Sequence, residues 1–304
     1  MANELGIIFS AILSISVFSL SSQSLLTAHG QIKNSPLQIA TSQFSLPALR
    51  AAASTTLFAI TPSFTAAVYL TGFVSLLGSI LYRRELNKSR HNKNKNIDPE
   101  KIKEFLSSSL KYSINGSINI AQLQLSTAIM GTLHGLTYAG YMAICNTILT
   151  AIYIAPNTIF STYLQKRYHT LQLHEYSTPL KHGAMSFAAG ALISVPLYAF
   201  AETFINLLFG SQYQEAINIF KAMCLAIPIR FFITCIGTAI LSERLVKLKI
   251  FAAGVGLIIQ ILLFITLSSF GSIGIGIGIG ISVIISEIIV ALLYLIIYLK
   301  SHTS

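Results

Sequence analysis

Five charged side chains lie inside long apolar runs of the sequence, where they could do chemistry away from bulk water. These residues are Arg50, Glu202, Lys221, Arg230 and Glu287. A charge at the centre of a bilayer costs at least ~2.5–3.5 kcal/mol, so each one needs a partner, a wet cavity or a route to the membrane surface. Glu202 and Lys221 lie close to the ends of their runs and can extend to the interface. Arg50 and Arg230 lie near the middle of theirs and cannot do so cheaply.

The two deep arginines need anionic or carbonyl partners. A guanidinium group presents a planar fork of donors, which can hold two oxygens of one oxyanion. Glu287 is the one deep carboxylate in the apolar runs. It can form an intramembrane ion pair, or it can titrate and couple protons to transport. Because one carboxylate cannot neutralise two arginines, at least one of Arg50 and Arg230 is expected to meet substrate or water.

A stripe of polar side chains follows one face of the fourth apolar run. Asn115, Asn119 and Gln122 are spaced by four and three residues, and Tyr112 and Ser126 continue the same spacing. Residues at such steps share one face of a helix. Within a membrane, this face must meet either a wet cavity or another helix. The amides could therefore line a path for a sugar, or they could join two helices.

The composition is typical of a membrane protein. The chain has 304 residues, of which 53% are hydrophobic and 10% are charged, whereas soluble domains carry about 25% charged residues. A membrane-spanning helix needs ~20 apolar residues. Nine such runs occur, at 5–28, 36–58, 63–82, 112–133, 138–160, 183–209, 216–241, 250–270 and 273–299. Their continuity does not fit the alternating strands of a β-barrel. We expect an all-α, polytopic bundle of about nine spans.

The basic residues predict how these spans are oriented. The stretch 83–111 contains nine of the twenty Lys and Arg residues, and Arg244, Lys247 and Lys249 flank the connection between spans seven and eight. All of these lie on one side of the membrane when nine spans are threaded alternately. The positive-inside rule places that side, and the C-terminus, in the cytoplasm. The N-terminus is then outside. We interpret 83–110 as a basic cytoplasmic linker in which Pro99 starts a helix.

An N-terminus outside the membrane, combined with an odd number of spans, is what we expect of a longer protein whose first helices are missing. A natural nine-span protein with its N-terminus outside is the alternative. No soluble catalytic constellation is present, so we expect no enzymatic activity, no cofactor and no metal site. The excess of basic residues is assigned to cytoplasmic loops, and no nucleic-acid partner is expected.

Small residues inside the runs are expected to serve packing. Cys145, Cys224 and Cys235 have neither CxxC spacing nor nearby histidine patterns, and we interpret them as small buried hydrophobic residues. Alternate glycines in the last run form two overlapping GxxxG pairs; they are Gly274, Gly276, Gly278 and Gly280. This pattern predicts close contact between helices.

The second half of the chain resembles the polysaccharide flippases of the multidrug, oligosaccharidyl-lipid and polysaccharide exporter superfamily. Four segments carry the resemblance: Leu110–Asn115, Gly135–Tyr141, Pro156–Phe160 followed by Tyr163 and Leu164, and Phe204–Ala216. The resemblance is good over 111–300 and looser over 5–82. Family members usually have twelve or more helices. The resemblance therefore implies that 1–82 holds the last three helices of an N-terminal bundle and 111–304 a six-helix C-terminal bundle, in an incomplete inverted-V exporter that lacks three helices.

The function implied by this resemblance is to flip a polyprenyl-diphosphate-linked oligosaccharide across the bacterial cytoplasmic (inner) membrane, for O-antigen or capsule synthesis. Arg50 and Arg230 would then bind the diphosphate, and Asn115, Asn119 and Gln122 would line the sugar path. Glu287 would be the candidate for ion coupling. The expected partners are the lipid-linked oligosaccharide, membrane lipids, and the glycan polymerase and ligase machinery. A cation-coupled multidrug exporter and a truncated, non-transporting remnant are the alternatives.

Overall fold

A computed structural model describes residues 64–89, 99–160, 177–240, 245–267 and 272–303, with positions 45, 48, 49, 52, 53, 56, 164 and 168. These residues form helices joined by short turns, and none of them is in a β-strand. The prediction of an all-α fold is confirmed for this part of the chain. The predicted spans at 5–28 and 36–58 lie outside the continuously described ranges, and so does Arg50.

The chain divides into two units, with the boundary between Asn96 and Ile97. In the first unit, α3 runs from Phe64 to Ser89. In the second unit, α4 begins at Pro99, as the sequence predicts, and runs without interruption to Leu133. Both helices therefore extend into the segment 83–110 that was assigned to a linker. The wholly apolar part of α3 is short, at Gly72–Leu81.

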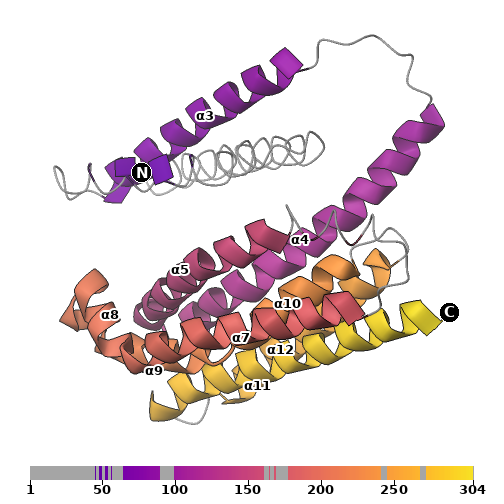
Figure 1. Ribbon diagram of the computed structural model, residues 1–304. Helices are drawn as coiled ribbons and strands as arrows, with labels where there is room; N and C mark the ends of the chain where they lie inside the picture. The colour runs from indigo at the N-terminus through magenta and orange to yellow at the C-terminus, as the bar shows by residue number, and fades with distance from the viewer. Residues whose placement is uncertain are drawn as a thin grey trace. The chain divides into compact units, whose positions relative to one another are not determined.

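The second unit is a bundle of helices packed side by side (Figure 1). After α4 come α5 (Leu136–Ile159), α7 (Ser177–Ala199), α8 (Ala201–Phe209), α9 (Gln214–Cys224), α10 (Ile227–Ala239), α11 (Val246–Leu267) and α12 (Ser272–Thr303). Helix α11 packs against α4 and α12, while α10 packs against α7 and α12. Helix α5 lies against α4 and α9. Helix α11 therefore connects α4 to α12, and α12 connects α11 to α10.

Two of the predicted spans are broken rather than continuous. The run 183–209 divides into α7 and α8, which are bent by 72° at Phe200. The run 216–241 divides into α9 and α10, which are bent by 46°. The second break follows from Pro228, because a proline has no N–H to donate to the carbonyl four residues earlier. That carbonyl belongs to Cys224, and it accepts a hydrogen bond from Ser194 Oγ of α7 at 2.7 Å instead.

Helix α12 lies parallel to α9 and α10 and in register with them. A Cβ atom added to Gly280 would collide with Ala222 of α9, because the α12 backbone at Gly280 lies directly against Ala222. Further along, Arg230 of α10 pairs with Glu287 of α12. Two turns later, a Cβ on Gly237 would lie 3.0 Å from the ring of Tyr294. Gly276 and Gly278 also have close neighbours in α9 and α11, so the prediction of close helix packing is confirmed for these two glycines and Gly280.

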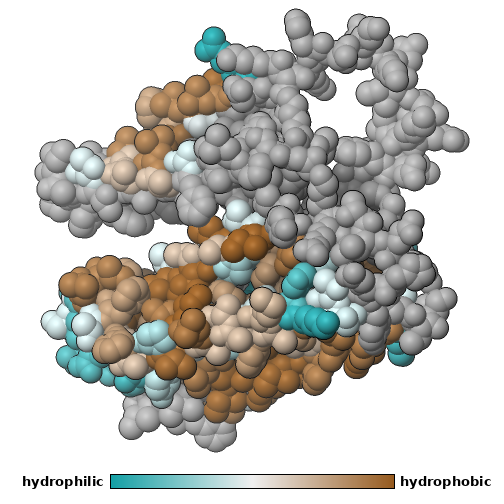
Figure 2. Space-filling model, viewed as in Figure 1, coloured by the Kyte–Doolittle hydropathy of each residue, from teal (hydrophilic) through white to brown (hydrophobic). Residues whose placement is uncertain are grey.

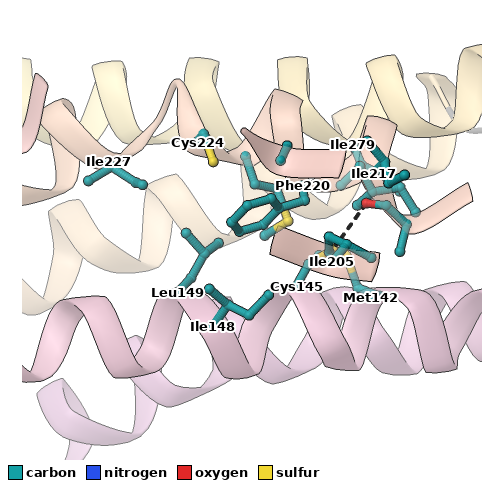
Figure 3. Close-up of a cluster of buried hydrophobic side chains, with 14 of the residues drawn as sticks. Met142, Cys145, Ile148, Leu149, Ile205, Ile217, Phe220, Cys224, Ile227 and Ile279 are labelled. Carbon is teal, nitrogen blue, oxygen red and sulfur yellow. Dashed lines mark hydrogen bonds between the residues drawn. The ribbon is translucent and has the colours of Figure 1, made fainter. Parts of the chain in front are cut away.

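The core between α5, α8, α9 and α12 is apolar (Figure 3). Phe220, Ile205 and Met142 are fully buried there, and Ile279 joins them from α12. Cys145 and Cys224 lie in this core, and Cys235 is buried in a smaller cluster with Phe160. All three cysteines are free thiols. Their prediction as small buried hydrophobic residues is confirmed.

The outer surface of the second unit is also largely apolar (Figure 2). Large exposed side chains include Leu192, Phe251 and Leu262, as a membrane-facing surface requires. Helices Leu136–Ile159, Val246–Leu267 and Gly278–Ser301 are long and apolar enough to cross a membrane, and the two bent pairs raise the number to five within the described residues. Helix α4 is not among them, because its amide side chains lower its hydropathy. The prediction of nine spans stays a prediction.

Candidate functional site

The centre of the second unit contains an ion pair between two of the predicted site residues. Arg230, near the start of α10, donates from Nη1 to Glu287 Oε1 of α12 at 2.9 Å. Their side chains are 13% and 12% exposed. The parallel register of α10 and α12 places the two groups opposite each other. Of the alternatives that the sequence left open for Arg230, the structure has the pairing with Glu287.

Gln122 of α4 brings a third helix to the same point. Its Oε1 accepts a second hydrogen bond from Arg230 Nη1, at 3.1 Å. The Gln122 amide is oriented by α11, because its Nε2 donates to the carbonyl of Ala253 at 3.5 Å. Gln260 of α11 donates in turn to the Gln122 backbone carbonyl at 3.2 Å. Since α11 holds the amide nitrogen, the oxygen of Gln122 is left to face the guanidinium.

The second oxygen of the Glu287 carboxylate is left without a partner. Oε2 is buried, and it has no hydrogen bond to any described residue. A buried carboxylate oxygen is costly to leave unsatisfied. This oxygen is therefore the place at which the site can take a proton, a water molecule or a donor from a ligand.

Two tyrosines complete the surroundings of the pair. Tyr153 of α5 and Tyr294 of α12 are both buried, with 8% and 2% of their surface exposed. Tyr153 also packs edge to face against Phe231, with ring centroids 6.4 Å apart. Neither tyrosine stands out in the sequence as a site residue, because a tyrosine in an apolar run is most often part of the core.

Lys249 is a second buried cation in this unit. Its Nζ donates to the Gly237 carbonyl at 2.7 Å and lies 5.8 Å above the ring of Tyr294. Gly237 is in the last turn of α10, where carbonyls lack intrahelical partners and a positive charge is favourable. The sequence placed Lys249 among the charges that flank a cytoplasmic turn. Its side chain is instead only 8% exposed.

We expect this burial to protect Lys249 from amine-reactive reagents. Lys247, two residues earlier and exposed, provides the matched control. In the folded protein, acylation by an N-hydroxysuccinimide ester should be at least roughly tenfold slower at Lys249, because its amine must wait for local opening. Peptide mass spectrometry measures both sites in one sample, and denaturation should abolish the difference. Equal rates in the folded protein would contradict the placement of Lys249.

The remaining residues of the predicted polar stripe lie apart from the ion pair. Asn119 Nδ2 donates to the carbonyl of Asn115 in its own helix, at 2.9 Å. Asn115 Oδ1 is buried and bonds to none of the described residues. Asn115 is separated from Gln122 by two turns of α4, or ~10 Å along the helix. The structure thus brings Gln122, Arg230 and Glu287 together, and Asn115 and Asn119 stay outside that group.

The charges that were expected near the outside end occupy the two breaks. Glu202 is exposed in the first turn of α8, and Lys221 is partly buried in the last turn of α9. Within the described ranges, no three His, Cys, Asp or Glu side chains are grouped to hold a metal ion.

Comparisons of the chain with family models, with curated proteins and with solved structures gave no match. The site therefore has to be interpreted from its own chemistry.

The arrangement of the site would allow a buried guanidinium to exchange one partner for another. Arg230 is held by a carboxylate and an amide that come from two different helices, and both contacts use the same nitrogen. An anion that enters the site can compete with Glu287 for the fork of the arginine. Protonation of Glu287 would weaken the ion pair in the same way. The cluster can thus link the binding of an anion to the relative position of α4, α10 and α12.

Proposed function

We propose that this chain is a membrane transporter that flips a polyprenyl-diphosphate-linked oligosaccharide across the cytoplasmic membrane for surface polysaccharide synthesis. The observation that supports this proposal best is the buried Arg230, whose partners come from α4 and α12. A guanidinium in an apolar bundle is costly unless it is paired, and its fork suits the oxygens of a diphosphate.

The transport cycle follows from the exchange of partners at this arginine. With no substrate, Arg230 is paired with Glu287 and Gln122. A diphosphate that reaches the site replaces the carboxylate, and the freed Glu287 takes up a proton at its oxygens. Because these groups lie on different helices, the exchange changes which helices are tied together. In this proposal Asn115 and Asn119 bind sugar hydroxyls nearer the cytoplasmic end, and Arg50 contributes a second guanidinium.

The architecture of the proposal is the one that the sequence predicts. Nine spans cross the membrane, with the N-terminus outside and the segment 83–110 in the cytoplasm. Residues 111–304 are the six-helix C-terminal bundle of an incomplete inverted-V exporter, and residues 1–82 contribute the last three helices of its N-terminal bundle. The glycan polymerase and ligase act on the product after it has been flipped.

Expression of the chain in bacteria that lack a surface-glycan flippase tests this function. We expect the surface glycan to be restored, as measured by glycan electrophoresis and staining of intact cells. Arg230→Lys should reduce the restored amount at equal membrane levels of protein, because lysine keeps the charge but loses the fork. Resistance to cationic drugs without glycan would instead identify a cation-coupled multidrug exporter. Neither phenotype, with normal membrane levels, would favour a non-transporting remnant.

A further inference from the structure

Helix α8 departs from the direction of the bundle at one of its ends (Figure 1). Helix α7 has 23 residues, a length of ~34 Å, which matches the ~30 Å hydrocarbon core; it is apolar enough for a span when it is taken together with α8. The nine residues of α8 add ~14 Å, but the 72° bend leaves only ~4 Å of this along the axis of α7. When α7 crosses the membrane, α8 therefore runs almost parallel to the membrane surface.

One side of α8 is anchored to the protein. Ala201 and Ile205 are fully buried, and α8 packs against α9 and the end of α7. After Phe209, Gly210 turns the chain with a φ of 92°, a backbone conformation that suits glycine. The orientation of α8 is thus fixed at both ends, by the break at Phe200 and by the turn at Gly210.

A different side of α8 presents large apolar side chains that no described residue covers. Phe200 is 65% exposed, Leu207 80% and Leu208 53%. The exposed apolar surface of α7 leads to the same point, with Leu192 at 77% and Tyr198 at 44%. The surface around α8 is therefore continuous with a surface that faces lipid wherever α7 crosses a membrane.

Two polar residues of α8, Glu202 and Asn206, lie on another side of the helix, because they are four residues apart. Glu202 is exposed, and it is the only charged residue in the helix. A helix with an exposed apolar side and a separate polar side is typical of one that lies in the membrane interface. Because α8 carries no basic residue, its apolar side chains would have to supply the attraction to lipid.

We propose that α8 lies in the plane of the membrane interface, with Phe200, Leu207 and Leu208 inserted among the lipid acyl chains. This inference depends on the chain being in a membrane, and it does not depend on the transported substrate. In the orientation that the basic residues predict, α8 lies in the outer leaflet. A second copy of the chain, a protein partner or open water are the alternatives for this surface.

Tryptophan fluorescence can test the proposal without background, because the chain contains no tryptophan. Leu207→Trp places the probe at the exposed apolar side of α8, and Leu208→Trp repeats the test one residue later. Glu202→Trp is the matched control on the polar side of the same helix. Leu192→Trp is the control for lipid contact deeper along α7. Each variant of the full chain is reconstituted into phosphatidylcholine vesicles, and its elution profile before reconstitution identifies any variant that has not folded.

Two quenchers then report the surroundings of each probe. Lipids brominated near the headgroup end of the acyl chain should quench L207W and L208W at least twofold more strongly than lipids brominated near the chain end. For L192W the deeper bromines should be the more effective. Aqueous iodide should quench E202W and have little effect on L207W. Quenching of L207W by iodide to the level of E202W would mean that α8 projects into water, and protection from both quenchers would mean that protein covers it. Either result would overturn the proposal.

Discussion

Replacing Arg230 with alanine is expected to destabilise the second unit by ~3–5 kcal/mol, because the substitution leaves the Glu287 carboxylate buried and unpaired. The oxygen of Gln122 loses its donor in the same step. Glu287 already has one oxygen without a described partner, so the remaining charge would have no hydrogen bond from the site. Thermal unfolding of the purified protein in detergent measures this loss.

A paired substitution separates stability from function at this site. In R230M/E287L both charges are replaced by apolar side chains, so no buried charge is left behind. Replacing a buried ion pair in this way is often neutral or stabilising, and we expect a thermal midpoint close to that of the parent. If the proposed function is correct, transport should nevertheless be lost, because the guanidinium proposed to bind the diphosphate is gone. A stable double variant that still restores the surface glycan would show that Arg230 is not needed to bind the substrate.

Replacing Gly280 with alanine is expected to weaken the contact between α12 and α9. The new Cβ would meet both the Cβ and the backbone of Ala222, and a backbone cannot move aside as a flexible side chain can. Overpacking of this kind typically costs ~1–3 kcal/mol. A unit of about 200 residues loses roughly 2–4 °C in thermal midpoint for each kcal/mol. The substitution should therefore lower the midpoint by several degrees.

Gly254 provides the matched control for this experiment. It also lies inside a membrane-length helix, α11, but a Cβ added there meets nothing within 4 Å. Gly254→Ala should leave the midpoint unchanged or raise it slightly, because alanine favours the helix by up to ~1 kcal/mol. If G280A and G254A shifted the midpoint equally, the close contact of α12 with α9 would not be the cause.

Much of the helical order could be predicted from apolar run length. The helix that contains 138–160 was expected to within a few residues, and the start of α4 at Pro99 followed from the preference of proline for a first turn. The glycine contacts of α12 were predicted from the GxxxG spacing alone. These features depend on residues that are close in sequence, so they can be predicted from a single sequence.

The breaks and the partners depend on residues distant in sequence. The length of the apolar run does not predict the bend before α10. Pro228 leaves the Cys224 carbonyl without a donor from its own helix, and Ser194 of α7, which is distant in sequence, supplies the hydrogen bond instead. The sequence offered Glu287 as one of several partners for Arg230, and the choice depends on the register of two helices. Lys249 was assigned to a loop because a basic residue near a turn usually stays in water. Its burial needs Gly237, which leaves room for the amine beside the α10 backbone.

The parallel register of α12 with α9 and α10 restricts how the second unit can move. Shear of α12 by one helical turn would separate Gly280 from Ala222, Glu287 from Arg230 and Tyr294 from Gly237 at the same time. All three contacts would be lost together, so small sliding steps offer no intermediate of similar energy. Rotation that carries α9, α10 and α12 together preserves all three contacts. Conformational change in this unit should therefore move α9, α10, α11 and α12 together as one rigid body.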